Sequence, residues 1–413
     1  MSFKALTIIK PILRAIADKN YDAPTPVQEK VIPLMLEKKD VVVSAQTGTG
    51  KTAAFALPII QQLFDRQNAA KKGKTIKALV ISPTRELAIQ IQENFKDYCK
   101  YTNLKTAVVF GGITQEPQVE ILKKGIDILV ATPGRLLDLH KQDALILDYV
   151  ETLVLDEADL MLDMGFIDDV KKIERLCPKS KQLLLFSATM PFKVEQLAST
   201  ILKEPERVDI SPTSSAAKNV HQVLYYVPKK DKIELCLHLL RNTIKGSILI
   251  FRRTKFGIEK LEKTLLNNQF KVGSLHGDKT QSEREDALIS FKNGDTNILI
   301  ATDVAARGID IDDLDAVLNF DLPNIPETYV HRIGRTGRAG KNGNSYSLCS
   351  ADEKAYVVSI QKLMLLQIDV IEDHPYPLDP GAKPEVHKKK QGGSKHRKGR
   401  KSEASKKKKK RWY

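Results

Sequence analysis

The sequence predicts an α/β protein with two parallel-sheet lobes and a basic C-terminal tail. Two series of short apolar runs alternate with longer amphipathic stretches, and turn residues bound most of the runs. Continuous apolar runs of this kind are typical of strands buried on both faces, as in parallel sheets. A stretch of small residues and proline separates the two series. We therefore expect lobes at 1–209 and 219–371, a linker at 210–218 and a tail at 372–413.

The first series supplies the expected strands of the first lobe, which lie at 41–45, 78–82, 106–110, 127–131, 152–156 and 183–187. The segments between them have helical spacing, as Leu87, Ile91 and Phe95 illustrate. Strands that alternate with helices in this way predict βαβ units and a parallel sheet.

The second series begins after the linker and has the same character. Its expected strands lie at 222–227, 247–251, 272–277, 297–303, 316–321 and 344–349, with helical segments such as 255–268 between them. The sequence has no self-similarity at a period of about 20 to 50 residues, so a solenoid of repeats is excluded.

The positive charge of the chain is concentrated near its C-terminal end. The 413 residues include 66 basic and 51 acidic side chains, a net charge of +15. Of these, 15 basic and 2 acidic residues lie within 383–411, so the rest of the chain carries only +2. This segment has almost no apolar residues with which to offset its ordering entropy, so we expect the tail to be disordered.

No segment has the pattern of a membrane span or a secretory signal. The longest stretch without a charged residue, 52–64, has 13 residues, whereas a spanning helix needs about 20. Lys4, Lys10 and Arg14 interrupt the apolar residues at the N-terminus, unlike a signal sequence. The four cysteines form no C-x-x-C pair. We therefore expect a cytoplasmic protein without a disulfide framework.

The segment AQTGTGKT at 45–52 follows the first expected strand and precedes an apolar helix. In this context backbone N–H groups and a helix N-terminus bind phosphates. Lys51 would reach the β- and γ-phosphates, and Thr52 would hold Mg²⁺. Because Ala45 stands where this pattern usually has glycine, a chance glycine-rich turn remains the alternative. The expected nucleotide-binding residues of the loop are Ala45, Gln46, Thr47, Gly48, Thr49, Gly50, Lys51 and Thr52.

Two carboxylates, Asp156 and Glu157, stand at the carboxyl end of the expected strand 152–156. In an open α/β sheet, a site for a metal and a nucleotide is expected at this edge. Asp156 would orient Mg²⁺, and Glu157 would accept a proton from the attacking water. The alternative is a solvated acidic turn that caps the next helix.

These segments belong to a longer series of motifs that resembles the DEAD-box ATP-dependent RNA helicases, and most closely the bacterial RhlE type. The match covers about residues 3–350, and the family shows the same opening alanine in the phosphate loop. The resemblance implies two RecA-like lobes that hydrolyse ATP with Mg²⁺ and locally unwind RNA duplexes. The motifs are Phe3, APTPVQ (23–28), AQTGTGKT, PTRELA (83–88), GG (111–112), TPGR (132–135), DEAD (156–159), SAT (187–189), FRRTK (251–255), HGD (276–278), ATDVAARGID (301–310) and HRIGRTGR (331–338).

The first of these motifs concern the base of the nucleotide. Gln28 lies in a turn-rich PTP context, and a glutamine amide can pair with both N6 and N7 of adenine. This pairing predicts ATP rather than GTP. By the resemblance, Phe3 stacks on the base; the alternative is that it anchors the first helix in the core.

The resemblance also places nucleotide contacts in the second lobe. Arg335 and Arg338 would be arginine fingers that reach the γ-phosphate when the lobes close, a role that suits a permanently charged fork. Asp303 and Asp310 would serve the closed nucleotide site, with Asp310 near the ribose; the alternative for each is an ordinary turn carboxylate. The residues that would link this site to the RNA surface are Ser187, Thr189 and His331.

The same resemblance implies an RNA surface of glycines, hydroxyls and a few arginines. Such groups contact the backbone and 2′-hydroxyls rather than base edges, so we expect little sequence specificity. Arg332 suits an RNA-binding loop as well as it suits the nucleotide site. The expected contacts are Pro83, Thr84, Arg85, Gly111, Gly112, Thr132 and Arg135 in the first lobe, and Arg252, Gly277 and Thr302 in the second.

The expected partner is RNA, and a monomer suffices for this chemistry. The basic tail would tether RNA and make its binding sensitive to salt. The alternatives are a tail that only solubilises the protein or, in a nucleated cell, an address signal. A DNA-directed translocase and an ATP-gated RNA clamp that does not unwind are the competing functions. The DEAD tetrad and the PTP-x-Q element disfavour the translocase.

Overall fold

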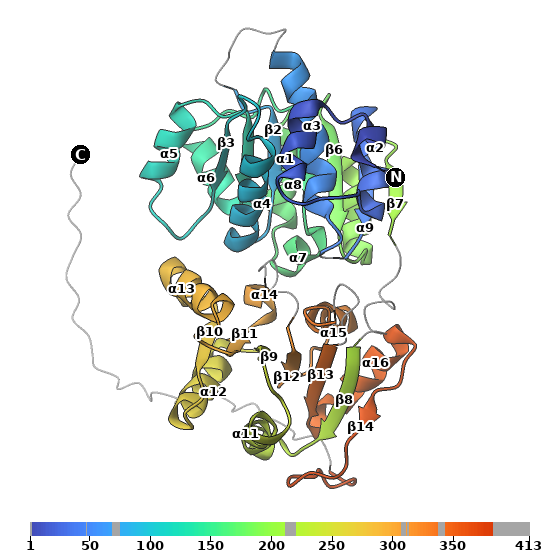
Figure 1. Ribbon diagram of the computed structural model, residues 1–413, viewed down its shortest axis with the longest axis vertical. Coiled ribbons are helices and arrows are strands. Elements are labelled where there is room, and N and C mark those ends of the chain that lie inside the picture. Colours follow the sequence, from blue (N-terminus) through green and yellow to red (C-terminus); the bar gives the residue numbers. More distant parts are fainter. Residues whose placement is uncertain are drawn as a thin grey trace, which may run out of the picture.

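The computed structural model describes residues 2–46, 48–67, 75–210, 220–306, 311, 314–337 and 343–382. Within these ranges the chain forms two seven-stranded sheets, in which every strand pairing is parallel. Figure 1 shows the two sheets in separate lobes, the N-terminal half of the chain above and the C-terminal half below. The predicted fold class is confirmed. The predicted linker after Ile210 and the tail from residue 383 lie outside the described residues.

The first lobe is a sheet covered by helices on both faces. Val41 and Val43 face one layer of helices and Val42 faces the other, which is the two-sided burial that its apolar runs predicted. The strands, in the spatial order β3-β4-β2-β5-β6-β1-β7, are β1 (Val41–Ser44), β2 (Ala78–Ile81), β3 (Thr106–Val109), β4 (Ile128–Ala131), β5 (Thr152–Leu155), β6 (Gln182–Ser187) and β7 (Glu206–Asp209). One layer contains η1 (Phe3–Leu6), α1 (Lys10–Ala17), α2 (Pro26–Leu36), α3 (Lys51–Gln67) and α4 (Arg85–Tyr98), and the other contains α5 (Glu116–Lys123), α6 (Pro133–Lys141), α7 (Ala158–Asp163), α8 (Ile167–Leu176) and α9 (Phe192–Ile201).

The second lobe is built in the same way. Its strands are β8 (Val220–Tyr226), β9 (Ile248–Phe251), β10 (Val272–Leu275), β11 (Ile298–Ala301), β12 (Ala316–Asn319), β13 (Gly343–Cys349) and β14 (Asp369–Val370). Its helices are η2 (Lys229–Asp231), α11 (Lys232–Asn242), α12 (Lys255–Asn267), α13 (Gln281–Lys292), α14 (Asp303–Ala306), α15 (Pro326–Ile333), η3 (Ala351–Glu353) and α16 (Lys354–Met364). Over the described ranges, none of the helices in either lobe is long and apolar enough to cross a membrane.

The two lobes have the same topology. The second sheet has the order β10-β11-β9-β12-β13-β8-β14, which repeats the order of the first when each lobe is counted from its own first strand. The sequence gives no sign of this relation as an internal repeat. A parallel sheet requires apolar strands and covering helices, and many different residues satisfy that requirement.

All the strands predicted from apolar runs are present, with small shifts at their ends. The sequence analysis missed two strands, β7 and β14. In β7 only Val208 is buried, and both residues of β14 are exposed. Each lies at the edge of its sheet with a single neighbouring strand, so neither needs a continuous apolar run.

Residues at and beyond the predicted end of the second lobe, residue 371, pack against β8. The N–H of Ile371 donates to the backbone oxygen of Leu224 at 2.9 Å, and the N–H of Leu378 donates to that of Tyr226 at 3.0 Å. Tyr376 packs against the core of this lobe. Because apolar and aromatic residues hold this segment in place, the packed lobe extends past the predicted start of the tail at residue 372.

Threonine caps begin several helices at the carboxyl edges of the sheets. Oγ1 of Thr84 accepts the N–H of Leu87 at the start of α4, and Oγ1 of Thr254 accepts the N–H of Gly257 at the start of α12. Such caps satisfy N–H groups that the helix cannot pair internally and contribute about 1 kcal/mol each. They fix where the chain leaves the edge of the sheet and enters the next helix.

Candidate active site and nucleic-acid interface

The strand order of the first sheet brings three predicted motifs together. Strands β5, β6 and β1 are neighbours, and the acidic motif, the segment 187–189 and the phosphate loop follow them in turn. Because the strands are parallel, their carboxyl ends lie at one edge of the sheet. The predicted RNA segments at 83–85, 111–112 and 132–135 follow β2, β3 and β4, the other half of the same sheet. Candidate nucleotide and RNA residues therefore occupy adjacent halves of one edge.

The phosphate loop leads from β1 into α3, whose first residue is Lys51. Gly48 and Gly50 have φ angles of 82° and 90°, which residues other than glycine rarely adopt. Nζ of Lys51 lies 2.7 Å from Oε1 of Glu157, and the two side chains are only 5% and 12% exposed. Burial lowers the pKa of the Lys51 ammonium, but the carboxylates of Glu157 and Asp156 outweigh it and raise that pKa above its usual value. Thr47 lies outside the described residues.

Gly50 is held against Gln28. Nε2 of Gln28 donates to the backbone oxygen of Gly50 at 3.1 Å, and Oε1 accepts the N–H of Thr25 at 3.0 Å. The Gln28 side chain thereby ties the start of α2 to the phosphate loop. Since an amide oxygen and an amide NH₂ can each make a second hydrogen bond, the adenine contact predicted for Gln28 stays a prediction.

We expect Gly50→Ala to weaken ATP binding by about tenfold or more, the equivalent of about 1.4 kcal/mol. A Cβ atom at Gly50 would lie 2.4 Å from Nε2 of Gln28. It would displace the Gln28 side chain and break its hydrogen bond to the phosphate loop. The matched control is Gly165→Ala, because Gly165 has a similar φ of 78° but open space around its Cβ position. The KM for ATP is the measurement; equal values for the two variants would show that the contact with Gln28 has no part in binding.

Asp156 and Glu157 follow β5 as predicted. Burial raises the pKa of the Asp156 carboxyl to about 7, and the Lys51 ammonium opposes the rise. Oδ1 of Asp156 accepts the N–H of Glu157 at 3.1 Å. Glu157 has a φ of 56°, a region that is uncommon for residues other than glycine and is frequent at functional sites. Asp156 is 2% exposed and neither side chain caps α7, so the alternative of a solvated capping turn is wrong.

Asp159, the last residue of the acidic motif, connects this motif to the segment 187–189. Its Oδ2 atom accepts both the N–H and the hydroxyl of Thr189, at 3.0 and 2.9 Å. Its N–H donates to Oγ of Ser187 at 3.1 Å. Ser187 and Thr189, predicted to link the two sites, therefore contact the acidic motif through a residue for which the sequence analysis proposed no role.

A cavity of about 580 Å³ lies over the phosphate loop, with residues of both lobes in its walls. Lys51, Thr52, Asp156 and Glu157 line it from the first lobe, and Arg335 lines it from the second. Arg335 follows α15 and is 4% exposed. In Figure 1, α15 lies at the end of the second lobe nearer the first, below α7. The structure therefore brings one of the two predicted arginine fingers to the nucleotide residues; Arg338 and Asp310 lie outside the described residues.

The aromatic residue in this cavity wall differs from the predicted one. Phe3 is 4% exposed, packs in the core of the first lobe and is not among the residues that line the cavity. Its ring therefore anchors η1, because apolar residues surround it. Tyr21 lines the cavity instead, as Gln28 does, and its hydroxyl lies 3.3 Å from that of Tyr98. The position of Tyr21 just before the PTP-x-Q element is the feature of the sequence that could have identified it as a cavity residue.

Asp303 is bound by Arg332 rather than placed in the cavity wall. Nε and Nη2 of Arg332 donate to its two carboxylate oxygens at 2.6 and 2.8 Å. Both residues line a small pocket with His331 and Arg335. This ion pair ties Asp303 to α15, and Arg335 follows that helix. The nucleotide role of Asp303 stays a prediction.

Two of the predicted RNA residues of the first lobe, Arg85 and Arg135, contact the loop after β3. A Cβ atom at Gly112 would lie 2.0 Å from Nη2 of Arg85, so the guanidinium occupies the space that a side chain would need. Nη2 of Arg135 donates to the backbone oxygen of Ile113 at 2.8 Å. Thr84 and Thr132 stand at the N-cap positions of α4 and α6 and, like Pro83, are buried. Gly111 has open space around it.

The predicted RNA residues of the second lobe follow three neighbouring strands, in the order β10-β11-β9. Gly277 is exposed, with nothing near its Cβ position. Oγ1 of Thr302 accepts the N–H of Ala305 at 3.3 Å, at the start of α14. A buried ion pair joins this half to the first lobe: Nη2 of Arg284 lies 3.0 Å from Oε1 of Glu86, and the side chains are 12% and 9% exposed. No feature of the sequence predicted that contact.

The donor atoms at this site suit a magnesium ion bound together with a nucleotide. Asp156 offers a buried carboxylate and Thr52 a hydroxyl, both of them hard oxygen ligands. Throughout the described part of the chain, no group of three or more His, Cys, Asp or Glu side chains could hold a metal ion. Mg²⁺ at nucleotide sites commonly takes one or two protein ligands and completes its shell with phosphate oxygens and water. The residues present therefore fit that ion.

Comparisons with known proteins cover both lobes. The family model for the DEAD/DEAH box helicase matches residues 25–197, and that for the helicase conserved C-terminal domain matches residues 218–340. The DEAD-box ATP-dependent RNA helicase RhpA of Helicobacter pylori is 41% identical over 371 residues, 90% of this chain and 74% of that protein. The ATP-dependent RNA helicase RhlB of Shewanella frigidimarina is 39% identical over 405 residues, 95% of this chain and 93% of that protein. The structure of S. cerevisiae Dbp5 bound to RNA and ADP BeF3 matches with a TM-score of 0.80 and 31% identity, over 90% of this chain and 95% of that one.

Proposed function

Since this chain belongs to the DEAD/DEAH box helicase family, we infer that its two lobes form one composite site in which ATP is hydrolysed as the lobes close on RNA. The protein is an ATP-dependent RNA helicase, with RNA as its partner. One observation carries the proposal of a composite site: Arg335 of the second lobe lines the same cavity as Lys51 and Glu157 of the first. Both lobes then contribute charged groups to one bound nucleotide.

Three charged residues of the cavity have separate roles in hydrolysis. Lys51 binds the β- and γ-phosphates, which replace Glu157 as the partner of its ammonium. Glu157, released from that pair, accepts a proton from the water whose oxygen attacks the γ-phosphorus, and the bond to the ADP oxygen breaks. Arg335 stabilises the charge that develops on the γ-phosphoryl group, because a guanidinium is permanently charged and matches phosphate geometry. We assign Arg338 the same role as Arg335.

Mg²⁺ would be held by Asp156 and Thr52 together with the phosphates. Bound there, the ion would neutralise phosphate charge during the transfer. Its positive charge would also favour the ionised form of Asp156, whose pKa burial raises.

The base of the nucleotide is proposed to lie against Tyr21. Its ring lines the cavity, is 37% exposed and is held through the hydroxyl contact with Tyr98. Aromatic rings stack on bases, and Gln28, which lines the same cavity, can still offer one acceptor and one donor to adenine. Tyr21 thus takes the stacking role that the sequence analysis gave to Phe3.

RNA is proposed to cross both lobes along the edges formed by β3-β4-β2 and β10-β11-β9. These edges carry all the predicted RNA residues, and the ion pair between Glu86 and Arg284 joins them. Glycines, hydroxyls and arginines favour backbone contacts over base reading. Of the predicted RNA residues, Gly112 and Gly277 are exposed, and the others are partly or fully buried. The assignment to the RhlE type stays a prediction, since the relatives compared above are named RhpA and RhlB.

Steady-state ATP hydrolysis tests the proposal, measured without nucleic acid, with single-stranded RNA and with DNA of matched sequence. We expect strong stimulation by RNA alone, followed by strand separation of a short RNA duplex in the presence of ATP. Stimulation by DNA would favour the DNA-directed translocase. RNA-stimulated hydrolysis without strand separation would favour the ATP-gated clamp, and equal hydrolysis under all three conditions would contradict closure on RNA.

A further inference from the structure

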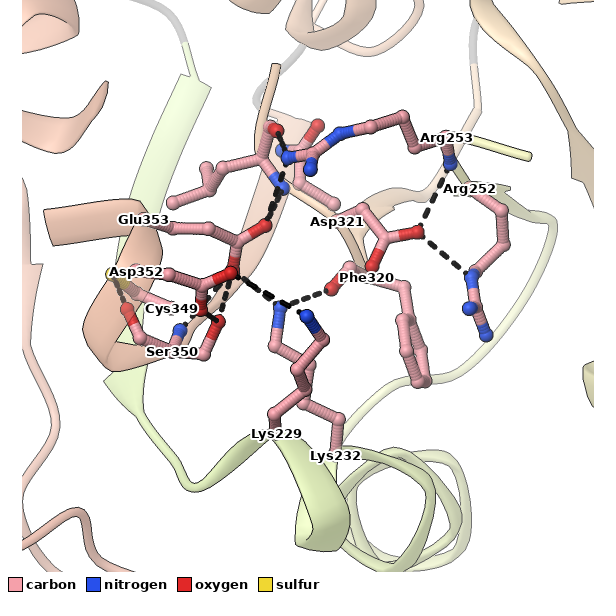
Figure 2. Close-up of polar contacts among 12 residues, drawn as sticks. Lys229, Lys232, Arg252, Arg253, Phe320, Asp321, Cys349, Ser350, Asp352 and Glu353 are labelled. Carbon is pink, nitrogen blue, oxygen red and sulfur yellow. Dashed lines mark hydrogen bonds and ion pairs between the residues drawn. The ribbon is translucent and has the colours of Figure 1, made fainter. Parts of the chain in front are cut away.

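One carboxylate holds the turn that leaves β9, where the predicted RNA residue Arg252 lies. Asp321 follows β12, the strand beside β9. Its Oδ2 atom accepts two hydrogen bonds of 2.9 Å, from Nε of Arg252 and from the backbone N–H of Arg253. Figure 2 shows these bonds reaching Asp321 from the two neighbouring arginines. The direction in which the chain leaves β9 therefore depends on Asp321.

The guanidinium of Arg252 is fixed on three sides. Asp321 binds Nε, the Cζ atom lies 4.1 Å from the centroid of the Phe320 ring, and a Cβ atom at Gly257 would lie 2.6 Å from Nη2. Its terminal nitrogens point away from Asp321 in Figure 2, and no acceptor in the described ranges binds them. The guanidinium thus presents these N–H groups in a set direction.

Arg253 points the other way and connects the turn to a buried ion pair. Its Nη2 atom donates to the backbone oxygen of Leu322 at 2.7 Å and to Oε1 of Glu353 at 3.1 Å. Glu353 also binds Nζ of Lys232 at 2.5 Å, and Lys232 donates to the backbone oxygen of Phe320 at 2.8 Å. Glu353 and Lys232 are 3% and 2% exposed. Because these buried charges are paired and hydrogen-bonded, they fix the turn after β12 that carries Asp321.

The same turn also contacts the helix that leads to the nucleotide cavity. The backbone oxygen of Asp321 accepts a hydrogen bond of 2.6 Å from Nη1 of Arg332. Arg332 lies on α15, and Arg335 follows that helix. The side-chain carboxylate of Asp321 thus binds the turn that contains the predicted RNA residue Arg252. Its backbone carbonyl binds Arg332 of α15, the helix that leads to the nucleotide cavity.

We propose that Asp321 is a positioning residue for RNA binding, which aims the Arg252 guanidinium at an RNA phosphate. The proposal rests on the RNA role of Arg252 proposed above and extends it. Contacts between arginine and phosphate depend on direction, and a guanidinium that is fixed before RNA arrives loses less conformational freedom on binding. Burial raises the pKa of the Asp321 carboxyl, but Arg252 and Lys232 outweigh it and hold that pKa below its usual value. The carboxylate is therefore charged at neutral pH.

A double-mutant cycle in the full-length protein tests this proposal, with Asp321→Ala, Arg252→Ala and both together. Affinity for a fluorescein-labelled single-stranded oligouridine is measured with ADP–BeF₃ bound, over a range of salt concentrations. Arg252→Ala is expected to weaken binding about tenfold, as the loss of a charged hydrogen bond does. It should also reduce the slope of log K against log salt by about 0.7, the share of one phosphate on a single strand. Asp321→Ala should give the same two losses alone and no further loss when Arg252 is already alanine.

Asp315→Ala is the matched control for loss of a carboxylate that holds a turn. Asp315 precedes β12, and its Oδ2 atom accepts the N–H and the hydroxyl of Ser247, just before β9, at 2.7 and 2.9 Å. This variant should lower the unfolding temperature without changing RNA affinity or its salt dependence. If Asp321→Ala does not fold, Asp321→Asn takes its place in the cycle, with the same pattern expected at smaller amplitude.

The outcomes separate this proposal from the proposed function. Normal RNA affinity in the Asp321 variant, or losses that add in the double variant, would overturn the positioning role while Arg252 itself remains an RNA contact. Normal affinity in Arg252→Ala would overturn the RNA role of Arg252 and the proposal with it. RNA-stimulated hydrolysis by the unaltered protein is measured alongside and depends on neither result.

Discussion

Glu157→Gln is expected to slow RNA-stimulated ATP hydrolysis by roughly a hundred- to ten-thousand-fold, the usual contribution of a general base. Both ATP and RNA should still bind. Glutamine has the size of glutamate and keeps an oxygen that can accept the hydrogen bond from Nζ of Lys51, which is 2.7 Å long in the native protein. It has no basicity with which to take a proton from water. The substitution therefore preserves the shape of the site and removes one chemical step.

The measurement is steady-state turnover, together with the separate affinities for a fluorescent ATP analogue and for single-stranded RNA. Glu174→Gln is the matched control. Glu174 also pairs with a lysine at 2.7 Å, and that lysine, Lys181, is 5% exposed, as Lys51 is. Lys181 immediately precedes β6 and so lies at the opposite edge of the sheet from the nucleotide residues. Turnover should be normal in the control; loss of ATP binding in Glu157→Gln would contradict the assigned role.

The nucleotide half of the site could be predicted because its residues lie directly after apolar strands. Lys51 and Asp156 each follow a run that has to be a buried strand, and parallel strands place their carboxyl ends together. The motif order along the chain does not reveal that β5, β6 and β1 are neighbours. The chemistry of the residues indicates indirectly that β5 and β1 end close together, because a phosphate-binding lysine and a general base have to act on one nucleotide.

Contacts between distant segments could not be predicted in the same way. Phe3 and Tyr21 are both aromatic residues upstream of Gln28, and only the path of the chain puts Phe3 in the core and Tyr21 in the cavity wall. Asp303 looks like an available carboxylate in the sequence, yet Arg332 engages both of its oxygens. The ion-pair partner of a side chain depends on which side chains meet in the fold, and a local sequence pattern does not predict that partner.

The lobe interface is the part of the site about which the sequence says least. The ion pair of Glu86 with Arg284 and the approach of Arg335 to the phosphate loop both join segments from different lobes. A buried ion pair gains enough to offset its desolvation only when both partners are held in good geometry. These contacts therefore depend on the relative position of the lobes, and opening of the cleft would break them together. This dependence makes the closed arrangement the one in which Lys51, Glu157 and Arg335 line one cavity.

Lys51→Ala is expected to weaken ATP binding by about a hundredfold or more. The ammonium would make at least two charged hydrogen bonds to phosphates, each worth about 1.5 to 3 kcal/mol, and about 1.4 kcal/mol corresponds to tenfold in affinity. The alanine also leaves Glu157 and Asp156 beside the phosphates without their cation, which adds repulsion. The rise in unfolding temperature caused by ATP measures this loss, because ligand stabilisation depends on the ratio of ligand concentration to Kd.

Loss of a buried ion pair destabilises a protein by itself, so the effect of Lys51→Ala on ATP binding has to be separated from its effect on folding. Lys181→Ala provides that separation, since it removes an equally buried lysine with a carboxylate partner at the same distance. Both variants should unfold at a lower temperature without nucleotide. Added ATP should stabilise Lys181→Ala as much as it stabilises the unaltered protein, and it should leave Lys51→Ala almost unchanged. Full ATP turnover in Lys51→Ala would rule out the phosphate-binding role of this lysine, because no other ammonium lines the cavity within the described residues.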